Sequence, residues 1–192
     1  MKTFGSVIKF LPGTSALRES WASTMNSRMA EAQASIFSEG VECESWFNFN
    51  IGTDTYAFVV MCKSERDQVI DAELALPIDQ VHREFKKTWN SAERFSCKTI
   101  QEFSPGELLP FASLQIVLAS EIDTADKSDQ AKFEFEVDGT AFVAFYDRGA
   151  SEVDISCEAI ECQCVLNVFV EDCYSSLKPS DLRPCAEQSR QV

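Results

Sequence analysis

The sequence predicts an α+β protein in which a ferredoxin-like βαββαβ domain precedes a smaller, mostly β C-terminal part. Three observations lead to this fold class. Short stretches that alternate apolar and polar residues favour strands, whereas two longer stretches with apolar residues every three or four positions favour helices. Gly, Pro and Asp-Gly turn signals separate these stretches. Acidic charge and cysteine content then rise after Ser104-Pro105-Gly106, so composition and turn chemistry both indicate a boundary near residues 104–110.

The first domain starts with a strand from Phe4 to Phe10, whose alternation is typical of a mostly buried strand. The chain then turns at Pro12-Gly13. An apolar stripe with helical spacing predicts one helix of about six turns. We expect it to end at Gly40, because glycine adopts the left-handed conformation without a Cβ clash. The residues of the stripe are Leu17, Trp21, Met25, Met29, Ala32 and Ile36.

The rest of the first domain is a hairpin, a second helical segment and a closing strand. The hairpin turns at Gly52-Thr53-Asp54, and helical residues resume at Ser64, pause at Pro77 and continue beyond it. The expected strands are residues 41–51, 55–62 and 97–103, and the second apolar stripe is Ile78, Val81, Phe85 and Trp89. These elements predict a four-stranded antiparallel sheet with two helices on one face.

Charge and cysteine divide the 192 residues unevenly. Residues 1–105 carry a net charge of −3 and residues 106–192 carry −11, and five of the eight cysteines lie in the second part. We therefore divide the chain into a ferredoxin-like domain at 1–104, an acidic, mostly β part at 107–176 and a loose tail at 177–192.

The second part has three strand patterns and one ambiguous segment. Asp138-Gly139 is a strong hairpin signal, since both residues tolerate positive φ. Residues 160–170 fit a long strand or a buried helix, and their β-branched content favours the strand. The expected strands are residues 114–119, 133–137 and 140–146, and residues 121–130 are expected to form a polar loop.

The composition excludes several classes of function. A net charge of −14 argues against binding nucleic acid through a basic face or docking on an anionic membrane. No stretch approaches the roughly 18–20 apolar residues that span a bilayer, and no signal peptide is visible. We therefore expect a cytoplasmic protein with reduced cysteines. The sequence has no dinucleotide-binding, Walker or metalloprotease motif, so we expect no cofactor.

His82 is the one histidine and the main candidate for acid–base chemistry. Asp79 lies three residues before it on a helical segment, where its carboxylate can reach the imidazole ring. Two interpretations are open: a base or hydrogen-bond donor at the mouth of a pocket, or a half-buried helix residue beside the break at Pro77. The sequence favours the second.

The cysteines favour core packing or a disulfide over a metal centre. Cys157, Cys162, Cys164 and Cys173 are close in sequence, but Cys162 and Cys164 are separated by only one residue. Zinc sites separate the two cysteines of a pair by two to four intervening residues, so that both sulfurs converge at a tight turn. We therefore expect no metal site.

One resemblance covers slightly over half of the chain. It is carried by the opening Ile8-Lys9-Phe10-Leu11-Pro12-Gly13 and by the run from Leu76 to Phe85, which reads LPIDQVHREF. With the βαββαβ order, residues 1–104 resemble the dimeric α+β barrel superfamily of antibiotic-biosynthesis-type monooxygenases. More narrowly, they resemble an uncharacterised bacterial family described as a domain of unknown function. We would expect histidine where Leu76 stands, so this chain lacks one potential functional group.

The resemblance implies a homodimer in which the helix-free face of the sheet packs against its twin. The sheet is expected to be apolar on both faces, so both faces must be covered. A second copy would cover the helix-free face, and so would the second part of the same chain, as an intrachain pseudo-dimer. A pocket between sheet and helices is also implied, and four aromatic residues are candidates to line it or simply to form core. They are Trp21, Trp46, Tyr56 and Trp89.

Function remains open between classes. We expect a non-catalytic module that binds a small ligand or a protein, because no complete catalytic set is visible. A basic protein is the partner that the acidic second part would suit. The main alternative is a cofactor-independent enzyme, monooxygenase-like or isomerase-like, that acts on a small organic substrate with His82 at its pocket. A third interpretation is a structural accessory protein without pocket chemistry.

Overall fold

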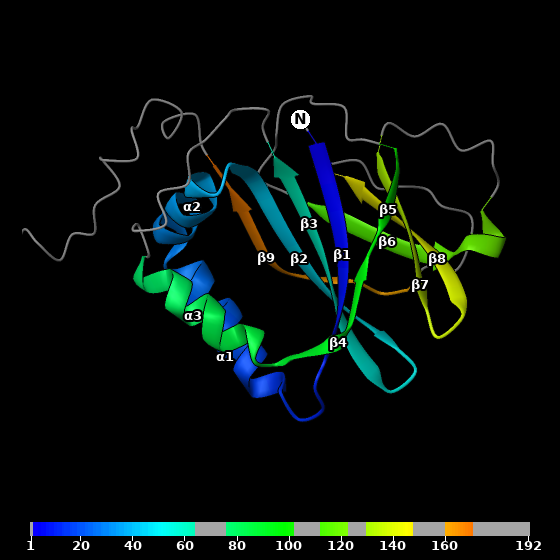
Figure 1. Ribbon diagram of the computed structural model, residues 1–192, viewed down its shortest axis with the longest axis horizontal. Helices are drawn as coiled ribbons and strands as arrows, with labels where there is room; N and C mark the ends of the chain where they lie inside the picture. Colours follow the sequence, from blue (N-terminus) through cyan, green and yellow to red (C-terminus); the bar gives the residue numbers. More distant parts are fainter. Residues whose placement is uncertain (1, 64–75, 102–111, 123–129, 148–159, 171–192) are drawn as a thin grey trace, which may run out of the picture.

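The computed structural model describes residues 2–63, 76–101, 112–122, 130–147 and 160–170, which form three layers (Figure 1). Helices cover one face of a five-stranded sheet, and a four-stranded sheet covers the other face. All strand pairs within the two sheets are antiparallel. The structure is therefore of the mixed α+β class.

The first sheet has the strand order β4-β1-β3-β2-β9. Its strands are β1 (Lys2–Phe10), β2 (Val41–Ile51), β3 (Asp54–Lys63), β4 (Trp89–Ser96) and β9 (Gln163–Phe169). The predicted four-stranded sheet is wrong by one strand, because β9 from the C-terminal part pairs along β2. The strand interpretation of residues 160–170 is confirmed, but its place at the edge of this sheet depends on a long-range pairing that no local pattern encodes.

Three helices lie on one face of this sheet: α1 (Ser15–Ser27), α2 (Met29–Ser38) and α3 (Pro77–Lys86). The prediction of one long first helix is wrong, because the chain leaves helical geometry at Arg28, with φ −118° and ψ 41°. The residues before the break explain it. Thr24, Asn26 and Ser27 each donate a side-chain hydrogen bond to a nearby backbone carbonyl. Such bonds compete with regular helix.

The end of α3 also differs from the prediction. The helix ends at Lys86, and Trp89 begins strand β4 instead of continuing the apolar stripe. The hydroxyl of Thr88 donates to the carbonyl of Phe85 at 2.7 Å, which helps to end the helix. The expected helical residues from Ser64 to 75 lie outside the described residues.

The second sheet has the order β5-β7-β8-β6. Its strands are β5 (Lys98–Gln101), β6 (Ser113–Leu118), β7 (Ala131–Val137) and β8 (Thr140–Asp147), and a short 3₁₀ turn, η1 (Ala119–Glu121), follows β6. The hairpin turn is confirmed, since Asp138 and Gly139 have φ of 50° and 78°. The predicted closing strand at 97–103 is present as β5, but it belongs to this sheet and β4 takes its expected place. The boundary at 104–110 and the tail at 177–192 lie outside the described residues, as does most of the expected loop at 121–130.

The helix-free face of the first sheet is covered by the second sheet of the same chain. Phe47, Phe58 and Val60 from the first sheet share one core with Phe133 and Tyr146 from the second. Of the two coverings that we expected, the intrachain one is therefore present. A sheet that is apolar on both faces is satisfied here by helices on one side and strands on the other.

Gly5 lies where the first sheet packs closely against Phe133 of the second sheet. A Cβ atom at Gly5 would lie 2.8 Å from Cδ1 of Phe133 and 3.1 Å from Cβ of Cys97. Alanine normally suits a strand better than glycine, so any destabilisation by Gly5→Ala must come from this contact. We expect Gly5→Ala to lower the free energy of unfolding by about 1–3 kcal/mol. Urea denaturation of Gly5→Ala, Phe133→Leu and the double variant measures it. Wild-type stability of Gly5→Ala, or no coupling to Phe133→Leu, would contradict this role.

Candidate functional site

The structure brings four of the predicted site residues together between the helices and the first sheet. The His82 ring lies 5.8 Å from Trp21 and from Trp46 and 6.3 Å from Trp89, measured between ring centroids. Phe85 completes this aromatic cluster, stacked on Trp21 at 3.9 Å. These five residues come from α1, β2, α3 and the start of β4, so the cluster joins α1 and α3 to the first sheet.

The aromatic cluster is packed. Trp21 and Trp46 are only 4% and 3% exposed, whereas His82 and Trp89 are half-buried. The ring nitrogens Nε1 of Trp21 and Nε1 of Trp89 are buried without a hydrogen-bond partner in the described part of the chain. Buried polar groups of this kind usually find partners. The cluster is thus part of the core, and two of its indole N–H groups lack hydrogen-bond acceptors in the described residues.

Asp79 does not reach His82. Its carboxylate accepts a hydrogen bond from the Leu76 amide at 2.6 Å and another from the Ser35 hydroxyl at 2.5 Å. The first of these bonds caps the start of α3, where free amides need acceptors, and the second ties α3 to α2. Asp79 therefore positions the helix that carries His82, and not the imidazole ring itself.

His82 is held in its neutral form. Burial lowers its pKa to about 4, and the nearby positive charge of Lys86 adds to the effect. Its Nδ1 atom is buried and has no hydrogen-bond partner in the described residues. At neutral pH the ring is therefore an uncharged imidazole without an orienting carboxylate.

The fourth aromatic candidate lies elsewhere. Tyr56 is 1% exposed and belongs to the core between the two sheets, where its ring stacks on Phe49 at 5.5 Å. Strand alternation explains the separation, because Tyr56 on β3 points to the opposite face of the sheet from Trp46 on β2.

Glu44 is a titratable group beside the aromatic cluster that the sequence reasoning did not single out. It accepts a hydrogen bond from Nε1 of Trp46 at 2.5 Å. Burial raises the pKa of its carboxyl group, and this hydrogen bond opposes the rise. The available signal was a carboxylate two residues from Trp46 on the same strand face.

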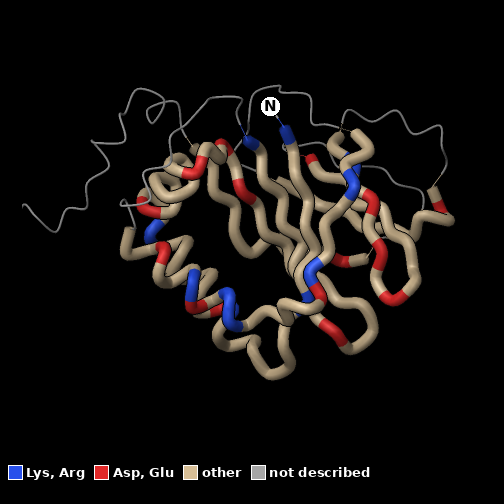
Figure 2. Tube along the Cα trace, viewed as in Figure 1, with Lys and Arg blue, Asp and Glu red and all other residues tan. Residues whose placement is uncertain are grey.

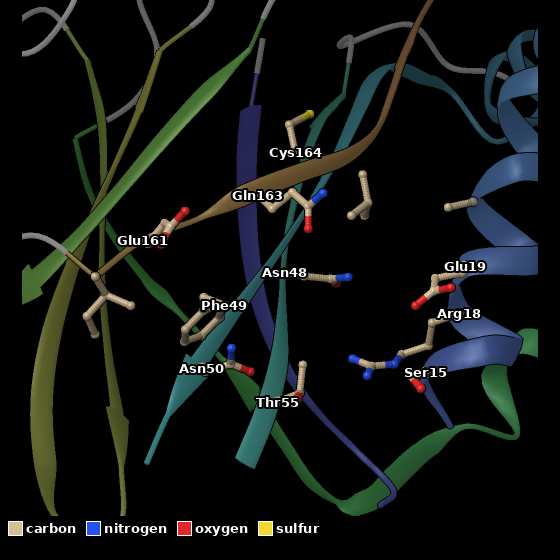
Figure 3. Close-up of a pocket in the computed structure, with 13 residues that line it drawn as sticks. Ser15, Arg18, Glu19, Asn48, Phe49, Asn50, Thr55, Glu161, Gln163 and Cys164 are labelled. Carbon is tan, nitrogen blue, oxygen red and sulfur yellow. The ribbon is translucent and has the colours of Figure 1, made fainter. Parts of the chain in front are cut away.

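A separate, open cavity of about 910 Å³ lies beside the start of α1 (Figure 3). Its walls come from α1, from β2 and β3, and from β9 together with the residues just before it. None of the five sequence-predicted aromatic and histidine candidates lines it. Its polar lining residues are Ser15, Arg18, Glu19, Asn48, Asn50, Thr55, Glu161 and Gln163, and the others are Ala22, Phe49, Ile160, Cys164 and Val165. Figure 3 shows the side chains of Arg18, Glu19 and Asn48 directed into the space between helix and strands.

Hydrogen bonds to β9 set the shape of this cavity. The Asn26 side chain donates to the Val165 carbonyl at 3.0 Å, and the Gln33 side chain donates to the Phe169 carbonyl at 2.7 Å. These bonds tie the end of α1 and the middle of α2 to the strand. The first turns of α1 carry no such tie to β9 in the described residues, and the cavity opens there.

Arg18 is the one basic residue among the described residues that line the cavity. Its guanidinium lies over the Phe10 ring, 4.5 Å from the centroid, and its Nε atom is buried without a partner. Burial lowers its pKa, and the negative charge of Glu19 opposes this. No ion pair to Arg18 occurs within the described part of the chain.

A family of unknown function (DUF6176) matches residues 1–103, more than half of the chain. The chain belongs to this family. No curated protein and no solved structure matches the chain significantly. The described helices include none that is long and apolar enough to cross a membrane.

The cavity is lined both by residues inside the family match and by residues outside it. Arg18, Asn48 and Thr55 lie inside the matched residues, whereas Glu161 and Gln163 lie outside them. The segment around residue 160 is fixed in place, since the Ile160 amide donates to the Ile116 carbonyl of β6 at 2.7 Å. The family domain thus supplies one wall, and the C-terminal part supplies the other.

Cys43 and Cys62 are neighbours on β2 and β3 in the core between the sheets, whereas Cys162 and Cys164 do not share a site. Cys162 packs against the core between the sheets, where burial raises the pKa of its thiol to about 12, whereas Cys164 is exposed and lines the cavity. The described residues contain no group of three or more His, Cys, Asp and Glu that could hold a metal ion. Cys157 and Cys173 lie outside the described residues.

Acidic side chains of the second part line one strand. Glu134 and Glu136 of β7 are exposed, and Asp138 follows at the hairpin turn (Figure 2). Lys98 of the neighbouring strand β5 pairs with Glu134 at 3.2 Å. The exposed face of β7 is therefore acidic but partly neutralised.

Proposed function

We propose that the protein is a non-catalytic module that binds a small polar ligand in the open cavity between α1 and the strands β2, β3 and β9. One observation carries this proposal: a cavity of about 910 Å³ is lined by amide and hydroxyl groups and by the Arg18 guanidinium, whose Nε atom has no hydrogen-bond partner in the described part of the chain. Binding sites for small molecules are concave, have volumes of about 300–1,000 Å³ and contain a few polar groups that orient the ligand. The volume and the unsatisfied Arg18 both fit this description.

The scaffold that we propose is related to the ferredoxin-like and dimeric α+β barrel folds. The partial order β4-β1-β3-β2 supports the relation, with β9 as an added edge strand. In the proposed arrangement the second sheet takes the position of a twin subunit. The burial of Phe47, Phe58 and Val60 under that sheet supports an intrachain pseudo-dimer over a homodimer formed through the same face.

The enzyme alternative rests on His82, and three observations weigh against it. Asp79 is engaged in capping α3, the pKa of His82 is lowered to about 4, and Trp21 and Trp46 fill the space around the ring. A general base works best with a pKa near the working pH. The buried Nδ1 of His82, which has no hydrogen-bond partner in the described residues, is the observation in favour of an enzyme, and it equally fits a histidine packed in the core.

The test of ligand binding uses the full chain. The protein is dialysed against a deproteinised bacterial cell extract, and small molecules enriched on the protein side are identified by mass spectrometry. Ala22→Trp places a large side chain in the cavity, whereas Ala16→Trp puts the same side chain on an exposed position of α1 outside it. We expect enrichment with wild type and Ala16→Trp, and a loss of about tenfold or more with Ala22→Trp, since the space for the ligand is filled.

Folding of each variant is checked by circular dichroism and thermal unfolding. Gln163→Trp, on the exposed opposite wall, provides a second way to narrow the cavity if Ala22→Trp unfolds the helix. No enriched compound with wild type, or equal enrichment with folded Ala22→Trp or Gln163→Trp, would reject the proposed function.

A further inference from the structure

We propose that the ligand of the open cavity is a small zwitterion, with its carboxylate on Arg18 and its ammonium group toward Glu161 on the opposite wall. This inference rests on the proposed function and adds the chemical class of the ligand. It follows from the charges of the lining residues and from their placement on the two walls.

Arg18 is the proposed partner of the ligand's carboxylate group. Its guanidinium is half-buried, has no ion pair in the described residues and keeps Nε buried without an acceptor. A charge held out of water without a partner is unfavourable. A carboxylate removes this deficit, because guanidinium donors match its two oxygens in a planar, bidentate arrangement. The Phe10 ring beneath Arg18 holds the guanidinium plane in place for such a contact.

The acidic residues select against ligands that are only anionic. Glu19 and Glu161 line the same cavity as Arg18, so two carboxylates and one guanidinium give the described lining residues a net charge of −1. A phosphate dianion would gain one favourable contact and meet two repulsive charges. A ligand that carries a positive group together with its carboxylate is complementary to all three side chains.

The placement of the charges sets the direction of the ligand. Arg18 projects from α1, whereas Glu161 precedes β9 on the far side of the cavity, and Asn48 and Gln163 lie between them (Figure 3). The amide groups of Asn48 and Gln163 offer donors and acceptors to the middle of a bound molecule. The carboxylate and the ammonium group are therefore expected at opposite ends of the ligand.

Chemical-shift titration of the ¹⁵N-labelled full chain tests the class directly. The probes are glycine, β-alanine, γ-aminobutyrate and ε-aminocaproate, which separate the two charges by increasing lengths. Butyrate, butylamine and inorganic phosphate are the controls, because each carries charge of only one sign. We expect at least one zwitterion to shift the cavity residues and to bind about tenfold or more tightly than every control, because only it satisfies both ends of the site.

Three variants test which residue binds each end of the ligand. Arg18→Gln is expected to lower the affinity for the best-binding zwitterion by about tenfold or more. Glu161→Gln is expected to lower that affinity by a few-fold, since Glu161 is exposed and its charge is screened by solvent. Arg83→Gln removes an exposed arginine of α3 outside the cavity and should leave binding unchanged. Glu161→Gln is also expected to leave butyrate binding unchanged or improved, which a merely structural role would not produce.

The results separate this inference from the function on which it rests. If butyrate or phosphate binds as tightly as the best zwitterion, if no zwitterion binds, or if Arg18→Gln binds like wild type, the zwitterion class is wrong. If the dialysis still enriches a compound that Ala22→Trp rejects, the cavity remains a ligand site of another class. Failure of both experiments overturns both proposals.

Discussion

Replacing Phe58 with alanine is expected to lower the free energy of unfolding by about 3–5 kcal/mol, the usual cost of emptying a large aromatic site in a core. Phe58 is 0% exposed in the centre of the first sheet. Its ring lies 5.6 Å from the rings of both Phe133 and Phe135 in the second sheet. Because the contact joins the two sheets, its loss destabilises the whole described core and not one layer.

Urea denaturation followed by two probes tests this expectation. The three tryptophans of the chain all lie in the aromatic cluster on the helical side, so their fluorescence reports that layer, whereas far-ultraviolet circular dichroism reports both sheets. Coincident transitions in wild type and variant indicate one cooperative unit. Ile100→Ala, at a 47% exposed position of β5, is the control and should change stability by less than about 1 kcal/mol. Separate transitions for the two probes would show that the two sheets unfold independently.

Acidification is expected to destabilise the protein through His82. Burial holds the pKa of this residue at about 4 in the fold, against 6.5 for an unperturbed histidine. Between these values the unfolded chain binds a proton that the folded chain does not, so unfolding becomes more favourable as pH falls from 6.5 toward 4. From pH 7 to about 4.5 we expect His82 to remove about 2–3 kcal/mol of stability.

Comparison of wild type with His82→Phe isolates this contribution. Glu44 acts in the opposite direction, because its raised pKa favours the protonated folded state at low pH, but it is present in both proteins. The two stability curves against pH, measured by urea denaturation, should therefore diverge below pH 6.5. Lys86→Met removes the positive charge that lowers the pKa of His82 and should make the loss smaller. Parallel curves for wild type and His82→Phe would contradict a buried, neutral His82.

Local patterns predicted the elements whose geometry is fixed within a few residues. The first strand, the hairpin turn before Asp54 and the turn at Asp138-Gly139 were all expected and are all present. Alternation along a strand and the positive φ of turn residues depend only on neighbouring side chains and backbone sterics. The family resemblance also rests on short local motifs, and residues 1–103 match a family of unknown function.

Local patterns gave wrong boundaries where other hydrogen bonds override the apolar spacing. The apolar spacing of the first helical stripe continues through Arg28, but side-chain bonds from Thr24, Asn26 and Ser27 break the helix. Trp89 has helical spacing from Phe85, but strand pairing with Phe10 on β1 takes it into β4. Periodicity reports which residues become buried and does not decide which hydrogen bonds the backbone makes.

The sequence by itself determined the α+β class, the main turns, the family and three of the aromatic residues that lie around His82, namely Trp21, Trp46 and Trp89. Only the tertiary structure decided that β9 extends the first sheet and that the second sheet covers its free face. The candidate site belongs to the same category, because Arg18, Asn48 and Glu161 are far apart in the chain and line one cavity only after β9 pairs with β2. Local interactions depend on neighbours in sequence, whereas a cavity depends on where distant segments leave space between them.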